Sequence, residues 1–268
     1  MNVGIIGFGS MGKMMAEKFT VLCGNKINGI YVTNRSKEKL LSVGEGISVC
    51  NDNRELASLC DIVFVCTRPV DIKSVVEEIV HSLKENALLV SLNGNVSFSA
   101  IEKIACRKIA KVIPSVTAEI NRSQTLVCYN RFAGECDKKN LTMILESMGN
   151  VIELPENEMG MGSELVSCMP GFIASIFDVI CQSAKNHTTL PEAQIKKMVL
   201  NTMSATGDLM LQKNMSFDEV VGRVATKGGI TEEGAKVIYE MFPQAADKMF
   251  EKTLEKRRQI AENAEKNF

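Results

Sequence analysis

The first twelve residues carry the clearest chemistry in this chain. An apolar run over residues 3–6 leads into Gly7-Phe-Gly-Ser-Met-Gly12, and a segment of helical character over 13–22 follows. In that context the first glycine permits a tight turn, the second lets the backbone approach a pyrophosphate, and the third lets the helix pack closely on the strand. A tight strand–helix turn without a ligand is the alternative. We expect a dinucleotide to be bound here by Gly7, Phe8, Gly9, Ser10, Met11 and Gly12.

A polar triplet follows the next β-branched run, residues 30–33, where the second strand of a βαβ unit should end. An NAD-specific site usually has an acidic residue at this point, which accepts hydrogen bonds from the ribose 2′-OH. This chain has Asn34, Arg35 and Ser36 instead, and a guanidinium attracts a 2′-phosphate that a carboxylate would repel. We therefore predict NADP(H) as the cofactor. Ser36 would also serve as the N-cap of a following helix, and both roles are compatible.

Two further loops are expected at the same edge of the sheet. The apolar run 61–66, typical of a strand buried on both faces, ends in Thr67, Arg68 and Pro69. The run 88–92 ends in Asn93 and a glycine. Because cofactors lie at the carboxyl ends of strands in doubly wound sheets, we expect these four residues to contribute to the cofactor site.

Strands and helices alternate from the N-terminus to about residue 155, and only helices follow. The fold class is therefore α/β, with an N-terminal Rossmann-type domain over 1–157 and an all-α domain over 158–268. The expected helices of the second domain cover 162–185, 191–213, 216–224, 231–241 and 243–266. The stretch 165–180 is apolar nearly all round, which is typical of a core or a subunit interface. We expect a homodimer or a larger homo-oligomer through these helices.

Composition excludes several classes of function. The formal net charge of the 268 residues is −1, so nothing favours nucleic acid or an anionic membrane as a partner. The nine cysteines form no Cys-x-x-Cys pair and there are two histidines, His81 and His187, so we expect reduced thiols and no metal site. We expect no signal peptide and no apolar run long enough to span a membrane. These features predict a cytoplasmic protein.

The motifs together are similar to those of the pyrroline-5-carboxylate reductase family over essentially the full chain. Besides the segments above, the resemblance rests on residues 112–117 (Val-Ile-Pro-Ser-Val-Thr), 167–170 (Ser-Cys-Met-Pro) and 226–234 (Thr-Lys-Gly-Gly-Ile-Thr-Glu-Glu-Gly). It implies a Rossmann domain, a helical domain that intertwines with a second subunit, and hydride transfer from the nicotinamide to the carbon of a cyclic imine. The product of the family's typical reaction is proline.

The resemblance implies that the loop 226–231 binds the substrate, through Thr226, Gly228, Gly229 and Thr231. Lys227 departs from the family's pattern and adds a cation for the substrate carboxylate, with a solvated loop lysine as the default alternative. Successive N–H groups of the glycine pair at the mouth of a helix can bind a carboxylate. The Thr231 hydroxyl would hydrogen-bond to the ring nitrogen and is our candidate catalytic residue, although a helix cap is its simpler role. No residue here suits proton transfer near neutrality, so an already protonated imine or a water is the expected proton source.

Several family positions are altered. The family's Ser-Gly-Ser-Gly-Pro-Ala segment appears as residues 166–171, which keep the proline but lose both glycines, and Ile230 and Met169 change the loops that would hold the substrate. A divergent branch that resembles a late-competence protein of Gram-positive bacteria has a similar Ile-Pro-Ser loop, and this chain looks closer to it. Three hypotheses follow: a pyrroline-5-carboxylate reductase, a related NADP-dependent oxidoreductase with another substrate, and a non-catalytic NADP(H)-binding regulatory protein. Cys168, within the altered segment and beside the expected pocket, is expected to be a buried structural thiol, with a lowered pKa as the alternative.

Overall fold

An eight-stranded sheet lies at the centre of the N-terminal part of the computed structural model, which describes residues 1–266 and 268. The strand order is β3-β2-β1-β4-β5-β6-β7-β8. All neighbouring strands are parallel except β6 and β7. The strands are β1 (Asn2–Ile6), β2 (Gly29–Thr33), β3 (Ile47–Val49), β4 (Ile62–Val65), β5 (Leu88–Ser91), β6 (Ile109–Ile113), β7 (Ser123–Tyr129) and β8 (Gly149–Glu153). The order β3-β2-β1-β4-β5-β6 is that of dinucleotide-binding domains, which confirms the expected Rossmann-type fold.

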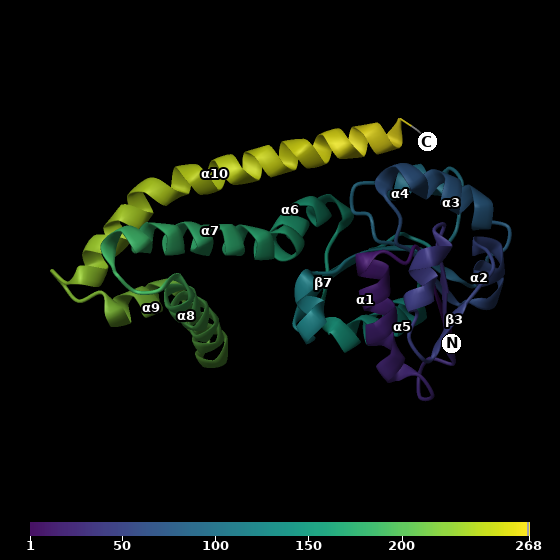
Figure 1. Cartoon of the computed structure of the whole chain (residues 1–268). Helices are drawn as coiled ribbons and strands as arrows, with labels where there is room; N and C mark the ends of the chain where they lie inside the picture. Colours follow the sequence, from purple (N-terminus) through teal and green to yellow (C-terminus); the bar gives the residue numbers. More distant parts are fainter. Residues whose placement is uncertain (267) are drawn as a thin grey trace. The chain divides into compact units, whose positions relative to one another are not determined.

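Helices cover both faces of this sheet (Figure 1). The buried side chains of α1 (Ser10–Phe19) and α5 (Glu135–Leu145) belong to one apolar cluster. Those of α2 (Asn53–Leu59), α3 (Ile72–Ile79) and α4 (Phe98–Glu102) belong to another.

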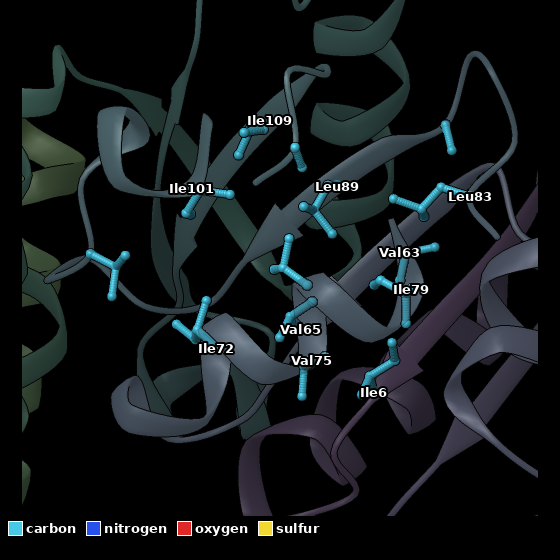
Figure 2. Close-up of a cluster of buried hydrophobic side chains, with 14 of the residues drawn as sticks. Ile6, Val63, Val65, Ile72, Val75, Ile79, Leu83, Leu89, Ile101 and Ile109 are labelled. Atoms are coloured by element: carbon cyan, nitrogen blue, oxygen red, sulfur yellow. The ribbon is translucent and has the colours of Figure 1, made fainter. Parts of the chain in front are cut away.

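Alternation along the strands supplies both clusters. Val3 and Ile5 of β1 lie in the cluster with α1, whereas Ile6 lies in the cluster with α3, which Figure 2 shows together with Val63, Val65 and Ile79. Successive side chains of a strand point to opposite faces of the sheet, so a run of apolar residues is buried on both sides. The strand ends, and with them the polar loops, are held by this double core.

The polypeptide divides into two compact units. The first comprises Met1–Pro170 together with Leu254–Phe268, and it holds the sheet, α6 (Met159–Ser163) and the π-helical turn Glu164–Cys168. The second, Gly171–Thr253, is helical; the helices that form it, wholly or in part, are α7 (Met169–Ala184), α8 (Glu192–Lys213), α9 (Phe217–Val224) and α10 (Ile230–Glu265). The domain boundary expected at 157/158 stays a prediction, since these units are defined by contacts and change at 170/171.

Two helix expectations differ from the structure. The segments 231–241 and 243–266 form one helix, α10, with Pro243 inside it. A proline removes one helix hydrogen bond at a cost of about 3 kcal/mol. Strong helix formers, Glu240 and Met241 before it and Ala245 and Ala246 after it, continue the helix through it. The helix expected after Ser36 is a 3-10 turn, Lys37–Ser42, which Gly44 and Gly46 follow.

The expectation about membrane spans is wrong. The helical stretch Glu156–His187 is long and apolar enough to cross a membrane by length and composition, with a mean hydropathy of 1.6 in its most apolar window. The structure extends the apolar run 165–180 into one longer helical stretch, which is why the sequence alone underestimated its length. Only 11% of that window is buried. An exposed apolar surface of this kind needs a covering partner, and length and composition alone do not distinguish a lipid bilayer from a second protein surface.

Candidate active site

A cavity of ≈ 560 Å³ opens at the carboxyl ends of β1, β2 and β4. It is the size of a small-molecule or cofactor site. Among the residues expected to bind the cofactor, those that line it are Gly7, Gly9, Asn34, Arg35, Ser36, Thr67 and Arg68. The structure therefore brings three of the expected loops together at the point where the strand order reverses.

The glycine turn has the geometry that its spacing predicts. Gly7 has φ +102°, and a Cβ there would lie 2.7 Å from the carbonyl oxygen of Cys66. A Cβ on Gly12 would lie 2.1 Å from the Gly7 carbonyl oxygen, so the third glycine is needed for the close packing of α1 on β1. A Cβ on Gly9 would meet nothing within 4 Å. The space above Gly9 is therefore open to a ligand.

Asn34 joins the glycine turn to the loop after β2. Its Oδ1 accepts a hydrogen bond from the Phe8 N–H at 2.9 Å, and its Nδ2 donates to the Ser36 carbonyl oxygen at 2.9 Å. Ser36 occupies the N-cap position of the following turn, but its hydroxyl makes no cap hydrogen bond. The capping role considered for Ser36 is thus not used, and Ser36 lines the cavity.

Asp71 contacts both arginines of the cavity. Its carboxylate lies 2.9 Å from the Arg68 Nε and 4.0 Å from the Arg35 Nη1, and the Arg35 side chain is 84% exposed. Lys37 and Lys39 also line the cavity. These cations form a region suited to a phosphate, and Asp71 accepts a hydrogen bond from one of them, Arg68. Sequence reasoning missed Asp71 and the lysines, although their proximity in sequence to Arg68 and Arg35 was a usable signal.

The floor of the cavity is polar. The Thr33 hydroxyl donates to Asn53 Oδ1, and Asn53 Nδ2 donates to Glu78, both at 2.7 Å. Thr67 Oγ1 is buried without a hydrogen-bond partner among the described residues. A buried polar atom usually has a partner, so this orphaned hydroxyl and the open space over Gly9 fit a bound dinucleotide. Burial raises the pKa of the neighbouring Cys66 thiol, which is therefore not a thiolate near neutrality.

The remaining expected cofactor residues do not line this cavity. The Phe8 side chain is 3% exposed and belongs to the core, and its backbone N–H is the group in contact with Asn34. Asn93 is 7% exposed, and its Oδ1 accepts a hydrogen bond from the Asn95 N–H at 2.8 Å. The others are Ser10, Met11, Gly12 and Pro69. Their contact with a cofactor stays a prediction.

The loop expected to bind substrate, Thr226–Thr231, lies in the second compact unit and precedes α10. Its glycine N–H groups are not free, contrary to expectation. The Gly229 N–H donates to the Thr226 carbonyl oxygen at 2.8 Å, and the Gly228 N–H donates to the Glu232 carboxylate at 2.6 Å. A carboxylate of the chain itself therefore occupies the donor that was assigned to the substrate. The turn bond needs the backbone alone, and Glu232 stands where capping residues usually do in a first helical turn.

The candidate catalytic residue, Thr231, lies inside the first turn of α10, which begins at Ile230. It is exposed and does not occupy the N-cap position that the simpler reading assigned to it. Lys227 is exposed as well. Burial, followed by the charge of Glu164, raises the pKa of the Cys168 thiol, so the alternative of a lowered pKa is wrong. The roles expected of Thr231 and Lys227 stay predictions.

Two family models match the two parts of the chain. Residues 2–94 match the model described as NADP oxidoreductase coenzyme F420-dependent, and residues 156–260 match the pyrroline-5-carboxylate reductase dimerisation model. Pyrroline-5-carboxylate reductase 3 of Bacillus subtilis is 31% identical, over 99% of this chain and 98% of its own length.

Two further comparisons concern the divergent branch and the fold. ComE operon protein 4 of Bacillus subtilis is 24% identical over 100% of this chain and 99% of its own length. The expected greater closeness to the late-competence branch is thus not supported, since the identity to the reductase is higher. A crystal structure of Plasmodium falciparum pyrroline carboxylate reductase with NADP bound has a TM-score of 0.85 at 21% identity, covering 97% of this chain and 98% of that chain.

Proposed function

Because the chain belongs to the pyrroline-5-carboxylate reductase family, we propose that it reduces the cyclic imine pyrroline-5-carboxylate to proline with NADPH. As a member of this family, the chain is an NADP-dependent oxidoreductase. In the proposed reaction the imine carbon gains a hydride, its nitrogen ends with one more proton, and NADPH becomes NADP⁺. The observation that carries the substrate assignment is 31% identity to a reductase of that name over nearly the full length of both chains.

The cofactor is assigned to the cavity of the first unit. NADPH supplies the hydride when bound. Arg35 and Ser36 would hold the 2′-phosphate, and Asp71 pairs with Arg68, which lines the same cavity. The open backbone at Gly9 would approach the pyrophosphate at the start of α1.

The imino acid is assigned to the loop Thr226–Thr231. The Thr231 hydroxyl is exposed and free to hydrogen-bond to the ring nitrogen while hydride is transferred. The Gly228 N–H and the Lys227 ammonium would hold the substrate carboxylate, and Glu232 must release Gly228 before that bond can form. Since no side chain of this loop is suited to proton transfer near neutrality, the imine enters protonated or a water supplies the proton, and positioning is the main contribution of the chain.

The assembly and location are proposed on the same basis. The dimerisation model covers residues 156–260, and apolar side chains of α7 and α8 are exposed in the single chain, among them Val179 and Leu209. The proposal is a homodimer or a larger homo-oligomer through these helices. All nine cysteines are free thiols, which supports the cytoplasm as the location.

NADPH oxidation in the presence of freshly prepared pyrroline-5-carboxylate is the test, followed at the nicotinamide absorbance. We expect turnover with NADPH in preference to NADH, and we expect Thr231→Ala to lower kcat by about tenfold or more, because one hydrogen bond to the reacting nitrogen is lost. Thr253→Ala, whose hydroxyl bonds within its own helix, is the control and should retain wild-type activity.

The negative outcomes separate the alternatives. Tight NADPH binding without turnover of pyrroline-5-carboxylate, but with turnover of another cyclic imine, would replace the substrate and keep the enzyme class. Binding without turnover of any imine would favour the regulatory NADP(H)-binding protein, for which the full-length similarity to ComE operon protein 4 is the supporting observation. Wild-type kcat in Thr231→Ala would remove the role proposed for that residue.

A further inference from the structure

The loop between β5 and α4, residues 92–97, lies at the same sheet edge as the cofactor cavity. The cavity is lined from the ends of β1, β2 and β4 and from the loop after β3, which is the side that receives the adenosine half of a dinucleotide. With the pyrophosphate at the glycine turn, the nicotinamide half must extend the other way, over the ends of β4 and β5. The β5–α4 loop is therefore the place where the reactive ring has to be received.

Contacts from outside hold this loop at two residues and the start of α4 at a third. The Arg257 Nη1 donates to Asn95 Oδ1 at 3.1 Å. The Ser97 N–H donates to Glu265 Oε1 at 3.2 Å. The Phe98 N–H donates to Glu156 at 2.7 Å, and Glu156 also pairs with Lys111, a buried cation on β6. Two of these contacts come from the last turns of α10, far away in sequence.

Arg257 is itself held rigidly. Glu164 Oε1 accepts from its Nε at 3.0 Å and from its Nη2 at 2.8 Å, and the Ser163 hydroxyl accepts from Nη2 at 3.0 Å. The Glu164 side chain is 1% exposed. A buried ion pair contributes little net stability over an apolar pair of the same shape, so its distinctive property is a fixed direction of the guanidinium. Here that direction leads the third nitrogen, Nη1, to Asn95.

Packing places the same helix end against the cofactor domain. Ala264 of α10 is 1% exposed and belongs to the apolar cluster that contains α3 and α4. The segment Leu254–Phe268 accordingly groups with the first compact unit, although residues 254–260 fall within the span that matches the dimerisation model. The end of α10 is thus a structural part of the domain that we assign to the cofactor.

We propose that Arg257 is a positioning residue for hydride transfer: oriented by Glu164, it holds Asn95 and with it the β5–α4 loop in the shape that receives the nicotinamide. This inference rests on the proposed placement of the cofactor. It does not depend on the identity of the imine. Rates of group transfer are sensitive to displacements of about 1 Å, which can lower them about a hundredfold, so a loosened loop should act on catalysis more than on cofactor affinity.

The cleanest test is Asn95→Ala, because it removes the hydrogen bond between Arg257 and Asn95 and leaves the Arg257–Glu164 pair intact. We expect kcat for NADPH oxidation to fall by about tenfold or more, with the KM for NADPH within about threefold of wild type. The isotope effect with nicotinamide-deuterated NADPH should rise as hydride transfer becomes slower. Asn95→Asp keeps an acceptor for the guanidinium and should restore most of the rate.

Arg257→Lys keeps the charge beside Glu164 but loses the planar guanidinium that contacts Glu164 and Asn95 at the same time. We expect the same defect as in Asn95→Ala. The double variant should be no worse than either single variant, since both act through one contact. Arg258→Lys is the matched control. Arg258 is next to Arg257 in sequence, but it is exposed and pairs with Glu255 and Glu262 on its own helix. That control should have wild-type kinetics.

A binding measurement separates this inference from the proposed function. NADPH fluorescence rises when the nicotinamide is immobilised, and we expect a smaller rise in Asn95→Ala at saturating NADPH, whether or not pyrroline-5-carboxylate is a substrate. A wild-type rise and a wild-type kcat in Asn95→Ala would overturn the inference. A fall in kcat that comes with a similar fold-loss of NADPH affinity and a lower melting temperature would overturn it as well, since that result indicates a merely structural contact. No turnover in the wild type together with the expected fluorescence change would refute only the substrate.

Discussion

At the scale of single residues, the N–H group of Gly228 can serve one carboxylate at a time, and in this structure Glu232 holds it. The Glu232 carboxylate also lies 3.9 Å from the Lys236 ammonium, so it has a second partner to which it can turn. A substrate carboxylate bound at Gly228 has to displace this side chain and must approach its negative charge. Glu232 is thus an internal competitor for the site that we assign to the imino acid.

Glu232→Ala should therefore lower the KM for pyrroline-5-carboxylate by about fivefold, the equivalent of one hydrogen bond of about 1 kcal/mol, with little change in kcat. Steady-state kinetics at saturating NADPH measure this directly. Glu233→Ala, which removes a neighbouring carboxylate that pairs with Lys236 at 2.7 Å, controls for the change in charge. If the KM rises in Glu232→Ala and not in the control, Glu232 shapes the loop and does not compete with substrate.

At the scale of elements, the glycines of the strand–turn–helix unit have separable roles. A Cβ on Gly12 would meet the backbone of Gly7 at 2.1 Å, whereas one on Gly9 would enter open space. We expect Gly12→Ala to lower the free energy of unfolding by about 2 kcal/mol or more, through overpacking of α1 against β1. Gly9→Ala should change it by less than about 1 kcal/mol, because φ of −84° at this N-cap position suits alanine.

For NADPH binding, in contrast to stability, we expect the substitution at Gly9 to have a clear effect. Gly9→Ala places a methyl group where the pyrophosphate is expected, and we predict a loss of NADPH affinity of about tenfold, equivalent to about 1.4 kcal/mol, in a protein that melts normally. Chemical denaturation and titration of NADPH fluorescence on the same samples test both statements. Normal NADPH affinity in Gly9→Ala would mean that the pyrophosphate does not lie on this turn.

Elements with strong local patterns were predictable from the sequence, and those set by long-range contacts were not. The apolar runs before Gly7 and Thr67 identified β1 and β4, because a parallel strand that is buried on both faces reads as a continuous apolar run in the sequence. The loops that follow them meet at one cavity, as the strand order requires. The contact of Arg257 with Asn95 joins residues 162 positions apart. No local spacing marks such a pair. The pairing of Asp71 with Arg68 is local (i,i+3) and could have been expected, whereas its approach to Arg35 joins residues 36 positions apart and could not.

At the scale of the whole molecule, the exposed apolar surface of the helical unit is the feature that a single chain leaves unexplained. Val179 is 67% exposed on α7, and Val237 and Ile238 are 59% and 61% exposed on α10. The most apolar window of the helical stretch 156–187 is only 11% buried. Soluble single chains rarely expose large apolar surfaces, whereas permanent subunit interfaces resemble a protein core cut in half. The match of residues 156–260 to a dimerisation model names a second copy of the chain as the cover.

Light scattering on the purified protein should accordingly give a mass of at least two chains, without detergent. Val179→Glu places a charge in the proposed interface, and we expect it to shift the mass toward one chain, because an unpaired buried charge opposes association. Leu41→Glu adds the same charge at a residue that is 88% exposed in the first unit, and it should leave the mass unchanged. A wild-type mass of one chain would contradict the assembly, and a protein that stays in solution only with detergent or lipid would point to a membrane as the cover instead. If Val179→Glu is monomeric yet still binds NADPH tightly, the cofactor site is complete within one chain, as the contacts of α10 with the first unit predict.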